Sequence, residues 1–304
     1  FIAGGTNLLD LMKEGVSTPN QLIDIRKLPV AEIALQTDDS ILIGAMAKNS
    51  AVAHHSLISQ RYPVLSEAIL AGASAQLRNM ATTGGNLMQR TRCSYFHDTD
   101  FACNKRQPGS GCAAIDGFNR SLAILGGSDH CIATHPSDMA VALVALDAIV
   151  HTHSANGNRQ IPIADFHLLP GDTPHLETVL EHGEMITGVE LPAIPYANRS
   201  HYLKVRDRWS YAFALVSAAV VLDVEDNKIR DARIAFGGVG TKPWRSPEAE
   251  QVLIGAPTTE ATFAAAADAA MQNATPRQHN GFKVALAKQT LKEALKTVAA
   301  RTSG

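Results

Sequence analysis

All the cysteines of this 304-residue chain lie in one stretch, as Cys93, Cys103, Cys112 and Cys131. The segment Asn104–Gly111 between two of them is polar, charged, glycine or proline, a composition typical of loops. Because this loop contains all the thiols, we expect interactions of the thiols to give it an ordered structure. Structural zinc sites pair cysteines at short spacings, and the common ferredoxin spacings are short as well; neither pattern occurs here. From the residues alone, a four-thiolate metal site, two disulfides and free thiols all stay open.

Two glycine turns of similar sequence precede the cysteines. The first is Ala3–Leu8 and the second lies within Arg78–Leu87, and each has two adjacent glycines with an asparagine and a leucine close behind. Glycine lets the backbone turn sharply and leaves room for a ligand, and amide N–H groups at a helix start attract phosphate oxygens. Each turn alone could be a plain tight turn or a bulge, because neither has the Gly-x-Gly-x-x-Gly pattern. Their repetition predicts a ligand with two polar faces or a long, diphosphate-bearing cofactor.

The stretch Pro136–Asp138 follows the last cysteine and leads into an apolar helix. Ser137 is a candidate helix cap, and Asp138 in the first turn would favour the helix dipole. Alternatively, Asp138 accepts a hydrogen bond from a cofactor hydroxyl. His135 is expected to be structural. Lys204 is a candidate contact for a phosphate, with a solvated charge as the plainer interpretation.

The pattern of apolar residues and turns predicts two α+β domains, with the boundary at 195–200. The first, residues 1–197, contains glycine turns, helices and strands but no regular βαβ array, and the cysteine loop at about 88–132 is inserted in it. The second, residues 198–304, is predicted to begin with antiparallel strands and to end with three helices over 246–254, 260–272 and 282–300. Strands are also expected at 21–25, 31–35, 40–43, 150–153, 160–163 and 184–191.

Composition excludes several classes of function. The net charge is −2, which gives no electrostatic reason to bind nucleic acid or an anionic membrane. No apolar run approaches the roughly 18 residues of a transmembrane helix, so no membrane insertion is expected. No signal peptide is visible. Because Phe1–Gly5 begins as if inside a strand and turn, we expect that further residues precede it.

Taken together, these motifs resemble the FAD-binding subunits of the molybdenum hydroxylase (xanthine oxidase) family. The two turns correspond to the family's two FAD loops, and the order of the downstream motifs is similar as well: Pro136–Asp138, Phe213–Ala214, Gly237–Gly238, Pro243–Arg245, Glu250 and Leu253–Gly255. The resemblance covers nearly the whole chain. It implies an α+β fold, with a two-part FAD-binding domain of the vanillyl-alcohol oxidase and CO-dehydrogenase flavoprotein type before the C-terminal domain.

The resemblance also implies the sites. The residues expected to bind FAD are Phe1, Ile2, Ala3, Gly4, Gly5, Thr6, Asn7, Leu8, Thr82, Gly84, Gly85, Asn86, Asp138 and Lys204. FAD subunits of bacterial periplasmic aldehyde oxidoreductases have an insertion that binds a [4Fe–4S] cluster between the second FAD loop and the Pro-Ser-Asp motif. Cys93, Cys103, Cys112 and Cys131 lie at that place and are the implied ligands. Thr83 departs from the family pattern, since many relatives have an aliphatic residue there.

The implied function is electron transfer, with no catalytic residue in this chain. In such heterotrimers a molybdenum-cofactor subunit oxidises the substrate, a [2Fe–2S] subunit passes electrons to FAD, and an external acceptor removes them. The resemblance implies a periplasmic location, with export alongside a partner subunit; a cytoplasmic location is the alternative. Two other functions are alternatives. One is a docking subunit that is stabilised by a bound metal and has no flavin, and the other is a stand-alone FAD oxidoreductase with its own substrate site.

Overall fold

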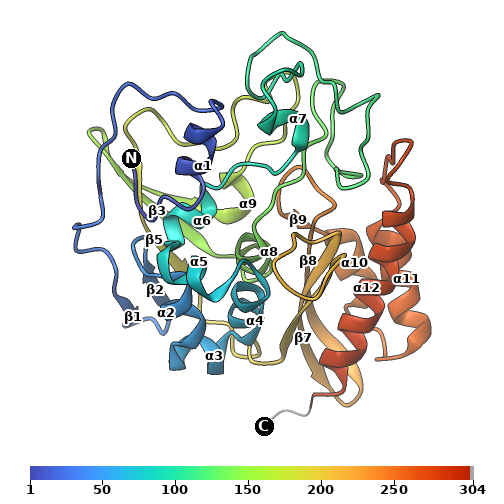
Figure 1. Cartoon of the computed structure of the whole chain (residues 1–304). Coiled ribbons are helices and arrows are strands. Elements are labelled where there is room, and N and C mark those ends of the chain that lie inside the picture. The colour runs from blue at the N-terminus through green and yellow to red at the C-terminus, as the bar shows by residue number, and fades with distance from the viewer. Residues whose placement is uncertain (302–304) are drawn as a thin grey trace.

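The computed structural model describes residues 1–301, which form two antiparallel sheets with helices between and beside them (Figure 1). The strands are β1 (Ile33–Leu35), β2 (Ile41–Gly44), β3 (Ile149–Ser154), β4 (Gly157–Pro162), β5 (Met185–Leu191), β6 (Ser200–Val205), β7 (Val216–Glu225), β8 (Lys228–Gly237) and β9 (Trp244–Arg245). The helices are α1 (Leu8–Lys13), α2 (Asn49–His54), α3 (Ser56–Arg61), α4 (Pro63–Ala71), α5 (Ala75–Met80), α6 (Thr83–Leu87), α7 (Ser94–His97), α8 (Asp138–Ala145), α9 (Ile163–Phe166), α10 (Pro247–Leu253), α11 (Glu260–Ala270) and α12 (Phe282–Ala299).

The first sheet has the strand order β1-β2-β5-β3-β4, and all its pairs are antiparallel. Its inner strands contribute Ile43, Val150 and Val189 to a core that also contains the apolar faces of α4 and α8. Every residue of α8 is buried. A helix that is apolar all round fits only inside a protein, which explains why α8 lies between the two sheets.

The second sheet has the order β6-β7-β8-β9 and is buried on both faces. Alternate residues of a strand point to opposite faces, and β7 follows this rule. Ala219 and Val221 pack into the core shared with α4 and α8, whereas Val220 and Leu222 pack into a second core beneath helices α10–α12. The apolar run in β7 therefore results from two helical layers, one on each side of the sheet.

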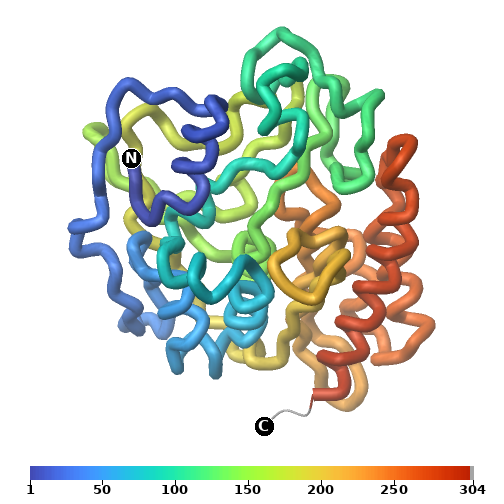
Figure 2. The backbone as a smooth tube through the Cα atoms, in the orientation of Figure 1, coloured from blue at the N-terminus to red at the C-terminus, as the bar shows by residue number. Residues whose placement is uncertain are grey.

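The cysteine segment forms a loop at the top of Figure 2, where the chain is green. Its regular structure is limited to the four-residue helix α7, and a small cluster with Phe96, Leu122 and Ile132 fills its interior. Helix α12 of the C-terminal part holds this loop. Fully buried Lys283 donates to the carbonyl oxygens of Ser121, Leu122 and Gly238 at 2.8, 3.0 and 2.6 Å.

The α+β class and the antiparallel C-terminal sheet with its three helices are confirmed. The strand predicted at 21–25 is wrong, because only a single bridge joins Ile2 to Asp24 there. Helices α2 and α3 meet at His55, which has an extended backbone and so separates them. None of the helices within residues 1–301 combines the length and the apolar character that a membrane span requires.

Candidate cofactor site

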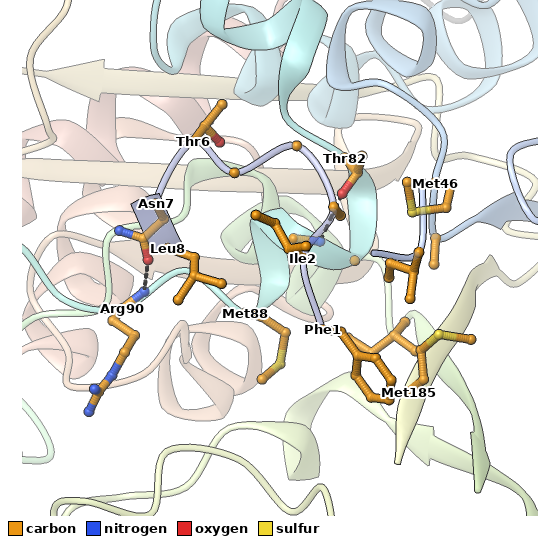
Figure 3. A pocket seen from close by; sticks show the side chains of 18 of the residues that line it. Phe1, Ile2, Thr6, Asn7, Leu8, Met46, Thr82, Met88, Arg90 and Met185 are labelled. Atoms are coloured by element: carbon orange, nitrogen blue, oxygen red, sulfur yellow. Dashed lines mark hydrogen bonds between the residues drawn. The ribbon is translucent and has the colours of Figure 1, made fainter. Parts of the chain in front are cut away.

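The two glycine turns lie against each other. A Cβ atom added to Gly4 would lie 2.2 Å from the carbonyl oxygen of Met80, so only glycine fits at this approach. The backbone N–H of Arg90 donates to Oδ1 of Asn7 at 2.9 Å, which links the first turn to the chain that leaves the second (Figure 3). The sequence prediction that these distant turns form one site is therefore consistent with their packing.

The second turn is helical, which is a correction to the sequence analysis. Residues Thr83–Leu87 form α6, and Oγ1 of Thr82 caps it by accepting from the N–H of Gly85 at 3.2 Å. Glycine disfavours helices, but a Cβ on Gly84 would lie only 3.2 Å from that of Ala45, so the close packing favours glycine here. Thr83 is buried and donates to the carbonyl oxygen of Ala47, away from any ligand.

Two cavities meet at the turns. The smaller has about 300 Å³ and is bounded by Phe1–Leu8, Thr82, Gly85 and a group of apolar side chains from three other segments: Ile25, Met46, Leu180, Met185 and Ile186 (Figure 3). The larger has about 610 Å³ and is bounded by Asn86, Asp138, Lys204 and the segment 207–208 and 211–215. Thr6, Asn7 and Gly85 line both cavities. Both volumes are in the range of small-molecule and cofactor sites.

A buried polar network forms one wall of the larger cavity. The Lys204 ammonium donates to Oδ2 of Asp138 at 2.7 Å and to the carbonyl oxygen of Ala71 at 3.2 Å, and the Tyr202 hydroxyl donates to Oδ1 of Asp138 at 2.6 Å. Burial and the Asp138 carboxylate raise the pKa of Tyr202 well above its usual value. Each carboxylate oxygen of Asp138 therefore already has a donor within the protein.

A second cation, Arg92, borders the larger cavity without a carboxylate partner within salt-bridge distance among residues 1–301. Its guanidinium lies 5.1 Å from the centre of the Phe213 ring, and burial lowers its pKa. The carboxylates of Asp10 and Glu14 lie near enough to oppose this lowering, but neither is within salt-bridge distance, so the Arg92 guanidinium is available to an anionic ligand. Sequence reasoning did not single out Arg92, although it directly precedes Cys93.

The four cysteines come together although their sequence spacing is irregular. All four are free thiols, so the alternative of two disulfides, which the spacing alone left open, does not occur. Cys93, Cys103 and Cys131 are buried in one cluster, Cys112 packs against it, and Cys103 pairs with Cys112 across a β-bridge. Burial, then the neighbouring thiols Cys131 and Cys103, raises the pKa of Cys93 to about 12.

Within residues 1–301, no group of three or more histidine, cysteine, aspartate or glutamate side chains is arranged to hold a metal ion. The thiols therefore do not fit a single ion in this conformation. A polynuclear cluster makes a different demand, because each thiolate then binds its own iron and the ligands lie further apart. The four free thiols lie in or against one packed cluster.

Comparison with known proteins identifies the family. Residues 1–194 match the family described as the FAD binding domain in molybdopterin dehydrogenase, and residues 200–298 match the CO dehydrogenase flavoprotein C-terminal domain. The chain belongs to the FAD-binding subunits of the molybdenum hydroxylase family. It is thus a subunit of an oxidoreductase.

Individual relatives cover nearly all of this FAD-binding subunit. It is 50% identical to the aldehyde oxidoreductase FAD-binding subunit PaoB of Escherichia coli (strain K12). The aligned region of 296 residues covers 97% of this chain and 90% of that protein. It is 26% identical to the carbon monoxide dehydrogenase medium chain of Hydrogenophaga pseudoflava over 99% and 89% of the two chains. A solved structure of carbon monoxide dehydrogenase from that organism has a TM-score of 0.77 at 25% identity, over 99% and 90%.

All fourteen residues predicted to bind FAD in this subunit line one or both of the two cavities. Those that border the smaller cavity are Phe1, Ile2, Ala3, Gly4, Gly5, Thr6, Asn7, Leu8, Thr82, Gly84 and Gly85, and those that border the larger include Asn86, Asp138 and Lys204. Three polar contributors were missed, namely Tyr202, Arg92 and Arg78. Arg78 and Arg92 border the larger cavity, and Tyr202 lies behind Asp138. No local pattern distinguishes them from ordinary core and surface residues.

Proposed function

We propose that this subunit holds FAD across the two joined cavities and transfers electrons within a molybdenum-containing aldehyde oxidoreductase. The observation that carries the proposal is the junction at Thr6, Asn7 and Gly85, residues of the two glycine turns that line both cavities. The name of the relative with 50% identity supports the aldehyde oxidoreductase assignment. FAD supplies the redox chemistry, and this chain supplies position and electrostatics.

The shape of the cavities supports one orientation of FAD. The pyrophosphate is assigned to the junction, where backbone N–H groups of the two turns and the start of α6 are available to phosphate oxygens. The smaller, apolar cavity fits the adenosine half, with Phe1, Ile2 and Met46 on its walls. The larger cavity fits the bulkier flavin half, with Lys204 and Arg92 as the cations beside it.

For the cysteine loop we infer a [4Fe–4S] cluster held by Cys93, Cys103, Cys112 and Cys131. Support comes from the burial of the thiols in one cluster and from the loop around them, which has little regular structure of its own. Thiolates are the ligands that iron–sulfur clusters use, and binding lowers the pKa of a thiol that burial alone raises. The cluster would stiffen the loop, and it would offer a second redox centre beside the flavin site.

The proposed partners are a molybdenum-cofactor subunit, which oxidises the substrate, and a [2Fe–2S] subunit, which delivers electrons to this chain. An external acceptor then receives them from this subunit. The role of the protein side chains is to bind and orient the cofactors and to keep water from the buried wall formed by Asp138, Lys204 and Tyr202. Electron transfer of this kind requires no general base.

Analysis of flavin, iron and acid-labile sulfide in the purified full-length chain and its complex tests both cofactor assignments. We expect about one FAD and about four irons with matching sulfide per chain, the stoichiometry of one [4Fe–4S] cluster. A chain that binds flavin without iron would refute the cluster alone, whereas a colourless chain with metal would favour a docking subunit. Oxidation of aldehyde by the isolated, molybdenum-free chain would instead indicate a stand-alone oxidoreductase.

A further inference from the structure

Tyr202 is a buried tyrosine whose hydroxyl lies behind the wall of the larger cavity. Its side chain is 5% exposed, and its hydroxyl lies 2.6 Å from Oδ1 of Asp138 and 2.8 Å from Oγ of Ser217. Tyr202 and Lys204 are two residues apart in β6, so both point to the same face of the sheet, toward α8. One strand therefore supplies both donors to the Asp138 carboxylate.

The carboxylate of Asp138 is committed to these two donors. Tyr202 holds Oδ1 and Lys204 holds Oδ2, and Asp138 is only 9% exposed. The sequence analysis expected Asp138 to accept from a cofactor hydroxyl, but the contacts favour a different role, that of a fixed counter-charge for Lys204. Lys204 uses two of its three N–H donors, on Asp138 and on the carbonyl oxygen of Ala71, while its side chain borders the cavity.

Other charged groups near this wall are already engaged with protein atoms. Arg206 donates to the carbonyl oxygen of Ala71 at 3.0 Å, and Glu67 accepts from His201 and Arg301. Asp207 is paired with Arg120 on the surface. Asp10, Arg78, Arg92 and Arg208 also border the larger cavity, and the Asp138–Lys204 pair is the buried ion pair of its wall.

We propose that Tyr202 is a positioning residue that holds the Asp138 carboxylate on Lys204, so that the hydrogen bond from its hydroxyl sets how strongly this cavity binds reduced relative to oxidised FAD. The inference rests on the proposed function. A hydrogen bond from a neutral donor spreads the charge of a carboxylate and stabilises it in one orientation. Without this donor, the negative charge of Asp138 is concentrated beside Lys204 and offsets more of the positive field that favours reduced flavin.

Tyr202→Phe tests the proposal, because it removes one oxygen atom and keeps the ring in the core. The measurement is the midpoint potential of FAD in the purified full-length chain, together with the affinity for oxidised FAD from fluorescence titration. We expect the ratio of the affinities for reduced and oxidised FAD to fall about tenfold, which lowers the potential of a two-electron couple by about 30 mV. A purely structural role would weaken both forms alike and leave the potential unchanged.

Two further variants separate the possibilities. Tyr196→Phe is the matched control, since Tyr196 also donates to an aspartate, but this aspartate, Asp231, borders neither cavity, whereas Asp138 borders the larger one; the potential should not move. Asp138→Asn should raise the potential by removal of the negative charge, and adding Tyr202→Phe to it should have no further effect. An unchanged potential in Tyr202→Phe, or an equal shift in the Asp138→Asn background, would overturn the inference. Absence of FAD from the wild-type chain would overturn the proposed function itself.

Discussion

Lys283 provides a prediction whose size can be worked out from the structure. Its side chain is fully buried, and its ammonium donates to three carbonyl oxygens. Burial, then the nearby Arg120, lowers the pKa of Lys283 from 10.5 to about 7. Between these two values the unfolded chain holds a proton that the folded chain has released. The free energy of unfolding should therefore rise with pH through this window, and this stability is lost as the pH falls toward 7.

The linkage relation gives the magnitude. Between pH 7 and pH 9, one lysine with these two pKa values adds about 2 kcal/mol to the free energy of unfolding. Lys283→Met removes the titration, so the difference in free energy of unfolding between wild type and variant should change by this amount. Denaturant unfolding at pH 7, 8 and 9 measures it. Because wild type and variant share all other titratable groups, the contributions of these groups cancel in the difference between the two free energies of unfolding.

Lys288→Met is the matched control, because Lys288 lies on the outer side of the same helix and pairs with Asp268. This variant should keep the pH slope of the wild type. A difference between wild type and Lys283→Met that is constant from pH 7 to pH 9 would refute the reasoning. It would mean that the three carbonyl oxygens compensate fully for the burial of the charge.

Three more predictions concern the site. Gly4→Ala should abolish FAD retention, because its Cβ would clash with the backbone of Met80, whereas Gly281→Ala, which meets nothing within 4 Å, should not. Burial lowers the pKa of His167 from 6.5 to about 4, so the wild type should lose about 3 kcal/mol of stability relative to His167→Gln between pH 7 and pH 4. Ser137→Ala removes the N-cap of α8 and should cost about 1 kcal/mol in thermal or denaturant unfolding.

Each of these has a contrary outcome. Normal FAD content in Gly4→Ala, measured by absorbance, would contradict the close approach of the two turns. Parallel acid-unfolding curves for wild type and His167→Gln would show that the imidazole is not held neutral. An unchanged unfolding free energy in Ser137→Ala would mean that another group satisfies the N–H of Ala140, which the serine now caps.

The regular parts of the fold were largely predictable from periodicity. Helices α11 and α12 differ from the prediction by two residues or fewer at their ends. The errors occurred where tertiary packing outweighed local preference. The glycine-rich segment Thr83–Leu87 is helical because Thr82 caps it and Gly84 packs closely on Ala45.

The cofactor site was predictable only in part, because its polar wall depends on contacts between distant residues. The turns could be recognised by their glycines, and the cysteines by their confinement to one loop. Tyr202 could not be recognised, since it meets Asp138 across 64 positions of sequence and resembles any strand tyrosine. For the same reason the sequence did not indicate that Lys204 pairs with Asp138, since these residues are 66 positions apart.

The joint between α12 and the cysteine loop has a consequence for the order of assembly. The loop belongs to the first half of the chain, but Lys283, which holds Leu122, follows it by 161 positions. During synthesis the ribosome releases the loop long before its anchor. The thiols therefore stay without their final support until the last helix has formed, and insertion of the proposed cluster should follow completion of the chain rather than accompany its growth.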